Sequence, residues 1–222
     1  MRLSTTFTLL TICLTAIGQT FPTKKDSGYR VDTSFIKKDI RQKTLTYYPR
    51  TYIDTEIRYT DSNGKGVIIQ NSLPKGGTGF TDSTGRKFGY RVFWSRVINE
   101  AATPLELTIN FPADSFPVPS PDAYMKVFLP PDTMTQDKET LHDYGATGLR
   151  SFFDTVLHTP TMLQRTINPK EAYVFYIVVL RHKGVGGTPR GGLVLKEQNL
   201  FYEINPEFGS ALIPCGQIVF KN

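Results

Sequence analysis

The sequence predicts an all-β protein, a β-sandwich with one short helix, and three observations lead to this prediction. Residues 172–180 form an uncharged run of β-branched and aromatic residues without Gly or Pro, which is typical of a strand buried on both faces. Several other segments alternate between apolar and polar residues with a period of two. Turns rich in Gly, Pro, Asn and Asp separate these segments, and only one stretch has helical periodicity.

Residues 1–18 have the pattern of a secretory signal peptide. Arg2 is the only charged residue before Lys24, and an apolar, Thr-rich run follows it. Small residues at Ala16 and Gly18 fit a cleavage site near Gly18. We therefore expect a secreted or periplasmic protein whose mature chain has no transmembrane segment.

Charge and cysteine content limit the partners and the chemistry of the mature chain. The formal net charge is +6, and it falls by one when cleavage removes Arg2. Such a modest excess predicts weak attraction to anionic surfaces, and export argues against a nucleic-acid partner. Cleavage also removes Cys13, which leaves Cys215 without a partner for an internal disulfide. No His or helix N-terminus lies beside Cys215 in the sequence, so we expect a buried, apolar thiol.

The precursor is expected to contain three segments. The signal peptide is followed by a polar leader at residues 19–44, and residues 45–222 are expected to form a single β-sandwich domain. The mature chain is long enough to bury a core without disulfides, and its length favours a jelly-roll-like sandwich. The alternative is two immunoglobulin-like domains divided near residues 112–123, where four prolines cannot donate hydrogen bonds to a sheet.

The strands follow from short apolar or alternating segments along the chain. They are predicted at residues 51–59, 67–69, 88–99, 105–111, 124–129, 162–167, 172–180, 193–204 and 212–220. Asn63 and Gly64 tolerate positive φ and predict a tight hairpin between the first two strands. Trp94 lies on the more apolar face of the third strand, so we expect it in the core.

One amphipathic helix is predicted at residues 148–158. Its apolar residues recur at the helical spacings i, i+3, i+4, i+7 and i+8, at Leu149, Phe152, Phe153, Val156 and Leu157. Thr147 is placed to cap the N-terminus, and Pro160 ends the helix. His158 at the C-terminus is explained by the helix dipole.

A polar loop at residues 132–146 holds weak candidates for a metal site and for a catalytic site. The oxygen ligands of a Ca²⁺ ion would come from Asp132, Asp137, Glu139 and Asp143. Their spacing matches neither a calcium loop nor a zinc motif, so a solvated loop is the favoured interpretation. The weak catalytic candidates are Glu139, His142 and Asp143, because neighbouring His and carboxylate groups suit acid–base hydrolysis of a glycoside or ester.

Two further sets of residues are weak candidates for ligand contact. The last Gly-rich loop is flanked by Arg181, Lys183 and Arg190, and glycine amides beside basic side chains suit an anion. No helix follows this loop and no phosphate-binding motif is present, so a flexible strand connection is the favoured interpretation. Tyr47 and Tyr48 lie in a polar stretch and are candidates for an exposed contact platform.

Three functions fit these observations. The first is an exported, non-catalytic module that binds a surface protein or glycan, because an export signal and an all-β pattern occur without a catalytic motif. The second is a secreted hydrolase that uses the acidic loop at residues 132–143. The third is a structural envelope subunit. Fold class alone does not choose among them, because β-sandwiches host many unrelated functions.

Overall fold

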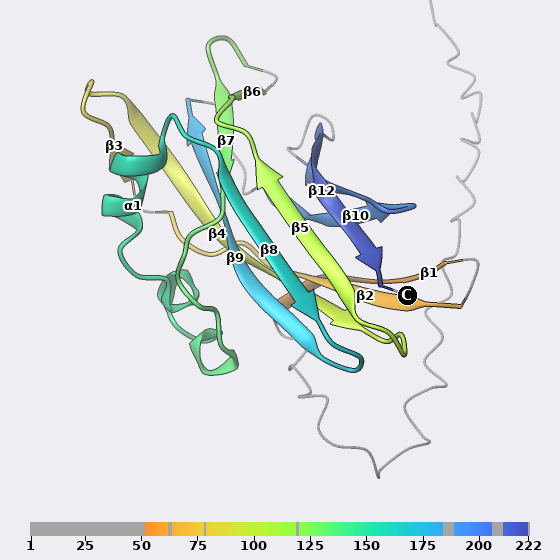
Figure 1. The fold of residues 1–222 in the computed structure, drawn as a ribbon. Coiled ribbons are helices and arrows are strands. Elements are labelled where there is room, and N and C mark those ends of the chain that lie inside the picture. The colour runs from red at the N-terminus through yellow and green to blue at the C-terminus, as the bar shows by residue number, and fades with distance from the viewer. Residues whose placement is uncertain are drawn as a thin grey trace, which may run out of the picture. The chain divides into compact units, whose positions relative to one another are not determined.

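The described part of the chain is predominantly β structure in two antiparallel sheets, with one α-helix (Figure 1). The computed structural model describes residues 52–61, 64–77, 79–118, 120–183, 189–205 and 211–221. These residues belong to a unit that spans residues 44–222. The expected signal peptide and leader, together with Tyr47 and Tyr48, lie outside the described residues.

Sheet A has the strand order β1-β2-β4-β9-β7-β6, and β3 also pairs with β4. Its strands are β1 (Ile53–Thr60), β2 (Gly66–Ser72), β3 (Gly79–Thr81), β4 (Lys87–Asn99), β6 (Phe116–Pro117), β7 (Tyr124–Phe128) and β9 (Ala172–His182). Antiparallel pairing of β1 with β2 confirms the predicted hairpin. Gly64 in its turn has a φ of 75°, the left-handed conformation that glycine adopts without strain.

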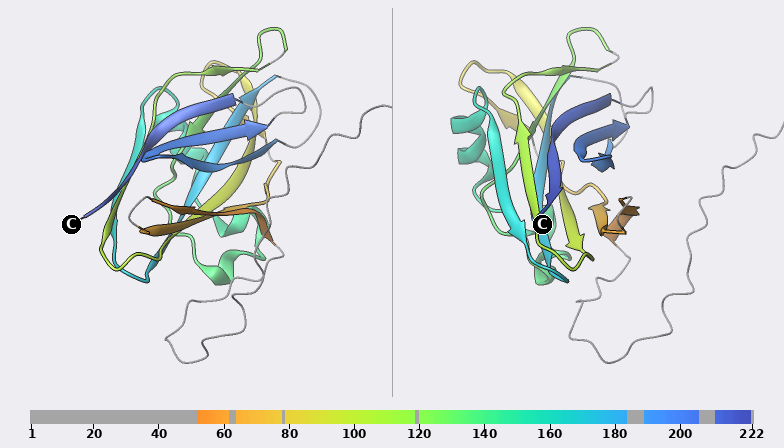
Figure 2. Two further views of the ribbon diagram at one scale, coloured as in Figure 1. Left: turned by 90° about the vertical axis from the view of Figure 1, so that its right-hand side faces the viewer. Right: turned by 45° about the vertical axis from the view of Figure 1, so that its right-hand side comes forward.

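Sheet B has the strand order β10-β11-β12-β5-β8. Its strands are β5 (Leu105–Phe111), β8 (Thr161–Ile167), β10 (Arg190–Lys196), β11 (Asn199–Asn205) and β12 (Ala211–Phe220). In Figure 2 the blue strands β10 to β12 can be followed beside the green β5 of the same sheet.

Strand β9 lies inside sheet A and is buried on both faces, as its sequence predicts. Its odd-numbered residues from Phe175 to Val179 join the core between the two sheets. Its even-numbered residues from Tyr176 to Leu180 join a second core on the opposite face of sheet A. Each of these large side chains contributes about 1.5–3 kcal/mol when fully buried, so sheet A requires a cover on each side.

Sheet B covers one face of sheet A. The predicted alternation in β5 is confirmed, because Leu105, Leu107, Ile109 and Phe111 are all fully buried between the sheets. Cys215 on β12 is buried in the same core, as predicted, and this burial raises the pKa of its thiol to about 12.

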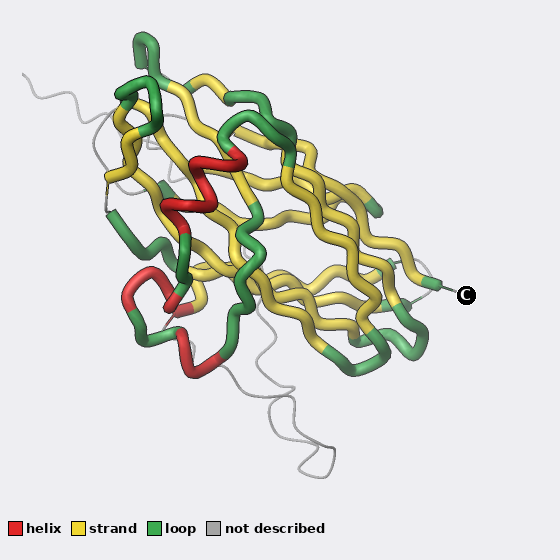
Figure 3. Tube along the Cα trace, turned by 60° about the vertical axis from the view of Figure 1, so that its left-hand side comes forward, coloured by secondary structure: helices red, strands yellow, loops and turns green. Residues whose placement is uncertain are grey.

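The helix α1 (Leu149–Val156) and the loop before it cover the other face of sheet A (Figure 3). This loop contains two 3-10 helices, η3 (Gln136–Lys138) and η4 (His142–Gly145). The ring of Phe153 packs 5.2 Å from that of Phe80, and Trp94 is buried in the same core as expected. Within the described residues, no helix has the length and hydropathy needed to cross a bilayer.

The predicted capping of this helix by Thr147 is wrong. The N-cap residue is Gly148, which has a φ of 64° and offers no side chain to the helix. Thr147 instead donates from its amide and its hydroxyl to Asp132 Oδ2, at 3.0 and 3.2 Å. Asp132, fifteen residues earlier, thus accepts two hydrogen bonds from Thr147, and the side chain of Thr147 is not the N-cap.

The single strand predicted at residues 193–204 is also wrong, because the chain forms two strands there. Strands β10 and β11 pair as a hairpin in which Lys196 lies opposite Asn199. The turn between them contains Glu197 in the left-handed conformation, with a φ of 59°. This turn contains no Gly, Pro or Asn, so the residues that usually mark a tight turn are missing from the sequence.

The proline-rich segment at residues 112–123 connects the two sheets. It leads from β5 in sheet B to β6 and β7 in sheet A. Strands from before and after the segment pair with each other in both sheets, as β4 with β9 and β5 with β8 show. The segment therefore crosses from one sheet to the other within the unit of residues 44–222.

We expect that Gly216→Ala will destabilise the fold by at least about 2 kcal/mol. A Cβ atom on Gly216 would lie 1.9 Å from the backbone oxygen of Thr108 on β5, so the two strands would have to separate. Urea unfolding of the full chain measures the loss. Gly89→Ala is the matched control, because a Cβ atom there meets nothing within 4 Å. Equal unfolding midpoints for the two variants would contradict this account.

Candidate functional site

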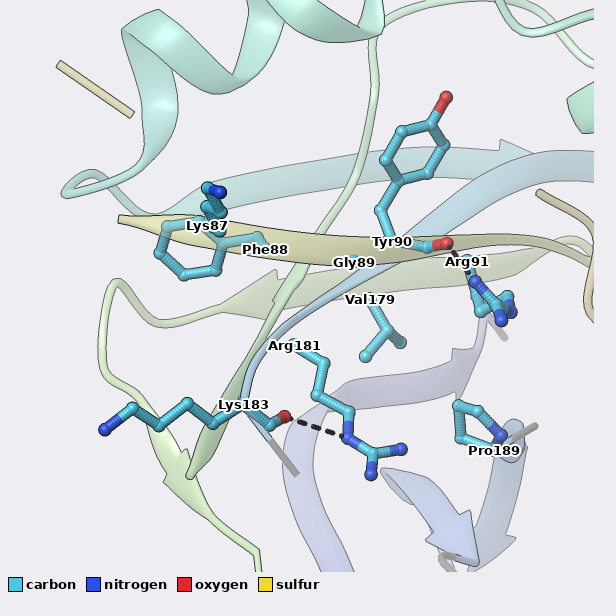
Figure 4. Close-up of a pocket in the computed structure, with 9 residues that line it drawn as sticks. All are labelled: Lys87, Phe88, Gly89, Tyr90, Arg91, Val179, Arg181, Lys183 and Pro189. Atoms are coloured by element: carbon cyan, nitrogen blue, oxygen red, sulfur yellow. Dashed lines mark hydrogen bonds between the residues drawn. The ribbon is translucent and has the colours of Figure 1, made fainter. Parts of the chain in front are cut away.

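A pocket of about 400 Å³ opens at one end of the paired strands β4 and β9. We call it the basic pocket, and it is lined by Lys87, Phe88, Gly89, Tyr90, Arg91, Val179, Arg181, Lys183 and Pro189 (Figure 4). Figure 4 shows the side chains of Arg91, Arg181 and Pro189 on one side of β4, with the ring of Tyr90 on the other.

The register of β4 and β9 places the basic residues of the pocket on one face. Gly89 lies opposite Arg181, and Arg91 lies opposite Val179. Because side chains alternate along a strand, Arg91 and Arg181 share the face on which Phe93 packs into the core between the sheets. The basic pocket therefore lies on the face of sheet A that packs against sheet B, next to the last apolar side chains of the core.

Gly89 leaves room in this face of the sheet. It lies between Lys87 and Arg91 on the same side of β4, and a Cβ atom added to it would meet nothing within 4 Å. Any larger residue would place its side chain in the open space in front of β4. The missing side chain thus contributes directly to the pocket.

The arginine side chains are held by backbone groups. Nη1 of Arg91 donates to the carbonyl oxygen of Tyr90 at 2.9 Å. The guanidinium also lies against Gly77, where an added Cβ atom would be 3.4 Å from Arg91 Nη1. On β9, Nε of Arg181 donates to the carbonyl oxygen of Lys183 at 3.3 Å (Figure 4). These backbone contacts help to orient both guanidinium groups.

Among the described residues that line the basic pocket, four are cationic and none is acidic. Lys183 reaches Asp122 at 3.4 Å, but both of these side chains are largely exposed, so solvent screens the pair. With like charges close together, the pocket favours an anion.

The sequence identified only part of this site. Among the three basic residues that flank the Gly-rich loop, Arg181 and Lys183 line the pocket. Arg190 does not, because it pairs with Asp54 of β1 at 2.9 Å. Sequence reasoning missed Arg91 and Lys87, which lie about ninety residues earlier on the neighbouring strand. Only the pairing register of β4 and β9 brings them to Arg181.

The acidic candidates of the loop at residues 132–146 do not gather in one place. Asp132 accepts from Thr147 and pairs with Lys138 at 3.2 Å, whereas Asp137 is exposed. Glu139 and Asp143 are only 2% and 5% exposed, in contrast to the expected solvated loop. Among the described residues, no group of three or more His, Cys, Asp or Glu side chains is arranged to hold a metal ion.

Lys75 anchors this loop to sheet A. Its ammonium group packs against the rings of Tyr52 and Tyr144, 4.5 and 4.4 Å from their centroids. It also donates to the backbone carbonyl oxygens of Glu139 and Leu141, the latter at 3.0 Å. Burial lowers the pKa of Lys75, and the negative charges of nearby Glu139 and Asp143 oppose this effect. Lys75 therefore fixes the start of the segment that follows β2.

Asp143 lies in a strained part of the backbone of the same loop. Asp143, Tyr144 and Gly145 have successive left-handed φ values of 50°, 54° and 65°, a conformation that is costly for residues other than glycine. The hydroxyl of Tyr90 donates to Asp143 Oδ2 at 2.8 Å, and His142 Nδ1 lies 3.4 Å from the same oxygen. A Cβ atom on Gly76 would lie 2.7 Å from Asp143 Oδ1, so this packing requires glycine.

Glu139 is a buried carboxyl group with altered acidity. Burial raises its pKa to about 7, and the positive charges of Arg96 and Lys75 only partly offset this effect. Its burial under the loop separates it from the basic pocket, which it does not line. We therefore assign Glu139 and Asp143 to the cover of sheet A.

No family model matches this sequence, and no curated protein matches it either.

We expect that Glu139→Gln will make the protein more stable at pH 8, by an amount on the order of 1–3 kcal/mol. The pKa of Glu139 is raised from 4.5 to about 7 in the folded protein. Between these values the folded state holds a proton that the unfolded state has lost, so stability falls as pH rises through this window. Urea unfolding at pH 4 and pH 8 measures the effect.

The matched control for this change is Glu197→Gln, at an exposed turn position. The gain from Glu139→Gln should be large at pH 8 and small at pH 4, while the control stays near zero at both. A gain of equal size at both pH values would show that ionisation of Glu139 is not its cause.

We expect that Lys75→Met will destabilise the protein by about 2–3 kcal/mol, because two carbonyl groups lose their donor. Lys196→Met is a matched control, since Lys196 is exposed and packs on the ring of Phe201 at 5.5 Å. Melting temperature and amide exchange of residues 139–145 are the measurements. An unchanged exchange rate in this loop would show that Lys75 does not anchor it.

Proposed function

We propose that this chain is an exported, non-catalytic binding module that recognises a surface protein or glycan through the basic pocket. The observation that supports this proposal is the pocket lining, in which the described residues include four cationic side chains and no carboxylate. Such a lining offers positive charge and several hydrogen-bond donors to a bound anion. The pocket is therefore suited to holding an anionic group.

We also propose that the two sheets form one β-sandwich of the jelly-roll-like kind. Both sheets contribute to one apolar core, and the described residues contain twelve strands. An immunoglobulin-like domain has seven to nine strands, so the larger architecture is favoured. The proposal of export, to a periplasm or out of the cell, rests on the signal pattern at residues 1–18.

We expect that the full mature chain binds specific partners on a glycan array or in a pull-down from a cell-surface fraction. The double variant Arg91→Gln, Arg181→Gln should lose at least about tenfold in affinity, because it removes two charges from the basic pocket. Arg150→Gln is the control, since Arg150 is exposed on α1 beyond the opposite face of sheet A. Failure to retain a specific partner in both assays would contradict the binding function.

A secreted hydrolase is the second proposal, supported by the acid–base groups of the loop. Glu139 has a pKa of about 7, and His142 lies 3.4 Å from the carboxylate of Asp143. A pKa near neutrality suits a general acid or base. A panel of glycoside and ester substrates tests this function. If a hydrolysed substrate is found, an unchanged rate in His142→Ala would exclude His142 from the reaction.

A further inference from the structure

We propose that the basic pocket takes an acidic sugar of a glycan, a ring that bears one carboxylate or one sulfate ester. This inference rests on the proposed binding function and specifies its ligand. The shared chemistry is an oxyanion fixed to a compact, partly apolar ring. Three features of the pocket support it: the placement of two guanidinium groups, the size of the space and the mixed character of its lining.

The two arginines are diagonal neighbours on one sheet face. Arg91 faces Val179 across the β4–β9 pair, and Arg181 faces Gly89. Diagonal neighbours in an antiparallel pair lie about 7–8 Å apart, close enough for their positive charges to repel each other. An oxyanion between them removes this repulsion, and the planar guanidinium group matches the geometry of a carboxylate or sulfate in a two-point contact.

The size of the pocket favours a ring over an acidic side chain of a protein partner. Its volume of about 400 Å³ lies within the range of small-molecule sites. The carboxylate of a single Asp or Glu would leave most of this space empty, whereas a sugar acid would fill more of it.

The lining provides an apolar surface beside the charge. Val179 and Pro189 lie on the same side of β4 as the two guanidinium groups (Figure 4). The C–H face of a sugar ring packs on such residues while its acidic group faces the arginines. Gly89 opens the space between these two parts of the site, because it has no side chain there.

Gly89 allows shape to be tested separately from charge. Gly89→Leu would fill the space in front of β4 and retain every cationic residue of the pocket. The variant should fold, because an added Cβ atom meets nothing within 4 Å. Gly89→Val is a second, smaller blocking variant, and melting temperature verifies that both are folded.

The test is isothermal titration of the full mature chain with three size-matched oligosaccharides. The probes are an oligogalacturonate that presents carboxylates, a sulfated oligodextran and a neutral oligodextran, each in 50 mM salt. We expect binding of at least one acidic probe and at least tenfold weaker binding of the neutral one. Arg91→Gln, Arg181→Gln and Gly89→Leu should each weaken acidic binding at least tenfold, and Arg150→Gln should leave it unchanged.

Several results would overturn the inference. Equal affinity for acidic and neutral probes would remove the role of the oxyanion. Acidic binding that survives Gly89→Leu and Gly89→Val would show attraction to the charged surface without entry into the pocket. If neither acidic probe binds while the array or pull-down retains a partner, the acidic sugar is wrong and the binding function stands. If that screen also retains nothing, both fail.

Discussion

The fold depends on the burial of strand β9 on both of its faces. Because this strand has no polar side, sheet A is stable only when apolar material covers each face. Sheet B supplies one cover, and α1 with its preceding loop supplies the other. The apolar run ends at Leu180, and the next residue on the pocket side is Arg181. The position of the basic pocket therefore follows from the place where the apolar part of β9 ends.

The loop that helps to cover sheet A brings polar groups into the protein. Glu139 and Asp143 are buried, and the backbone at Asp143 and Tyr144 is strained. Lys75 compensates by donating to carbonyl groups of the loop and by packing against two aromatic rings. Strain and buried charge of this kind often mark functional sites, but here the same contacts also explain how a polar loop is fixed to an apolar sheet.

The basic pocket and the loop that covers sheet A contact the same short segment of backbone, residues 75–77. Gly76 packs against Asp143 on the helix-covered side, and Gly77 packs against Arg91 at the basic pocket. Lys75, just before them, pairs with Val92 of β4 through two backbone hydrogen bonds of 2.8 and 2.9 Å. The guanidinium group of Arg91 also donates to the carbonyl oxygen of Tyr90, and a preorganised donor loses less entropy when it binds an anion.

Features set by local periodicity were predictable from the sequence alone. These include the strands β5 and β9, the apolar face of α1 and the burial of Trp94. Each depends only on how neighbouring side chains alternate within one element. The turn at Glu197 was not predictable, because pairing of the flanking strands imposes its conformation and no turn-forming residue marks it.

Other features depended on the tertiary structure, because their partners are distant in the sequence. Thr147 does not cap α1 but donates from its amide and hydroxyl to the distant Asp132. Glu139 is buried although its type and its polar surroundings favour exposure, because Lys75 contacts the loop from 64 residues earlier. The sequence by itself determined strands such as β5 and β9, and it determined that β9 is apolar on both faces. The tertiary structure decided that Arg91 lies next to Arg181, because the pairing register of β4 and β9 sets this contact. The two residues are ninety positions apart, so no local sequence pattern indicates that they are neighbours.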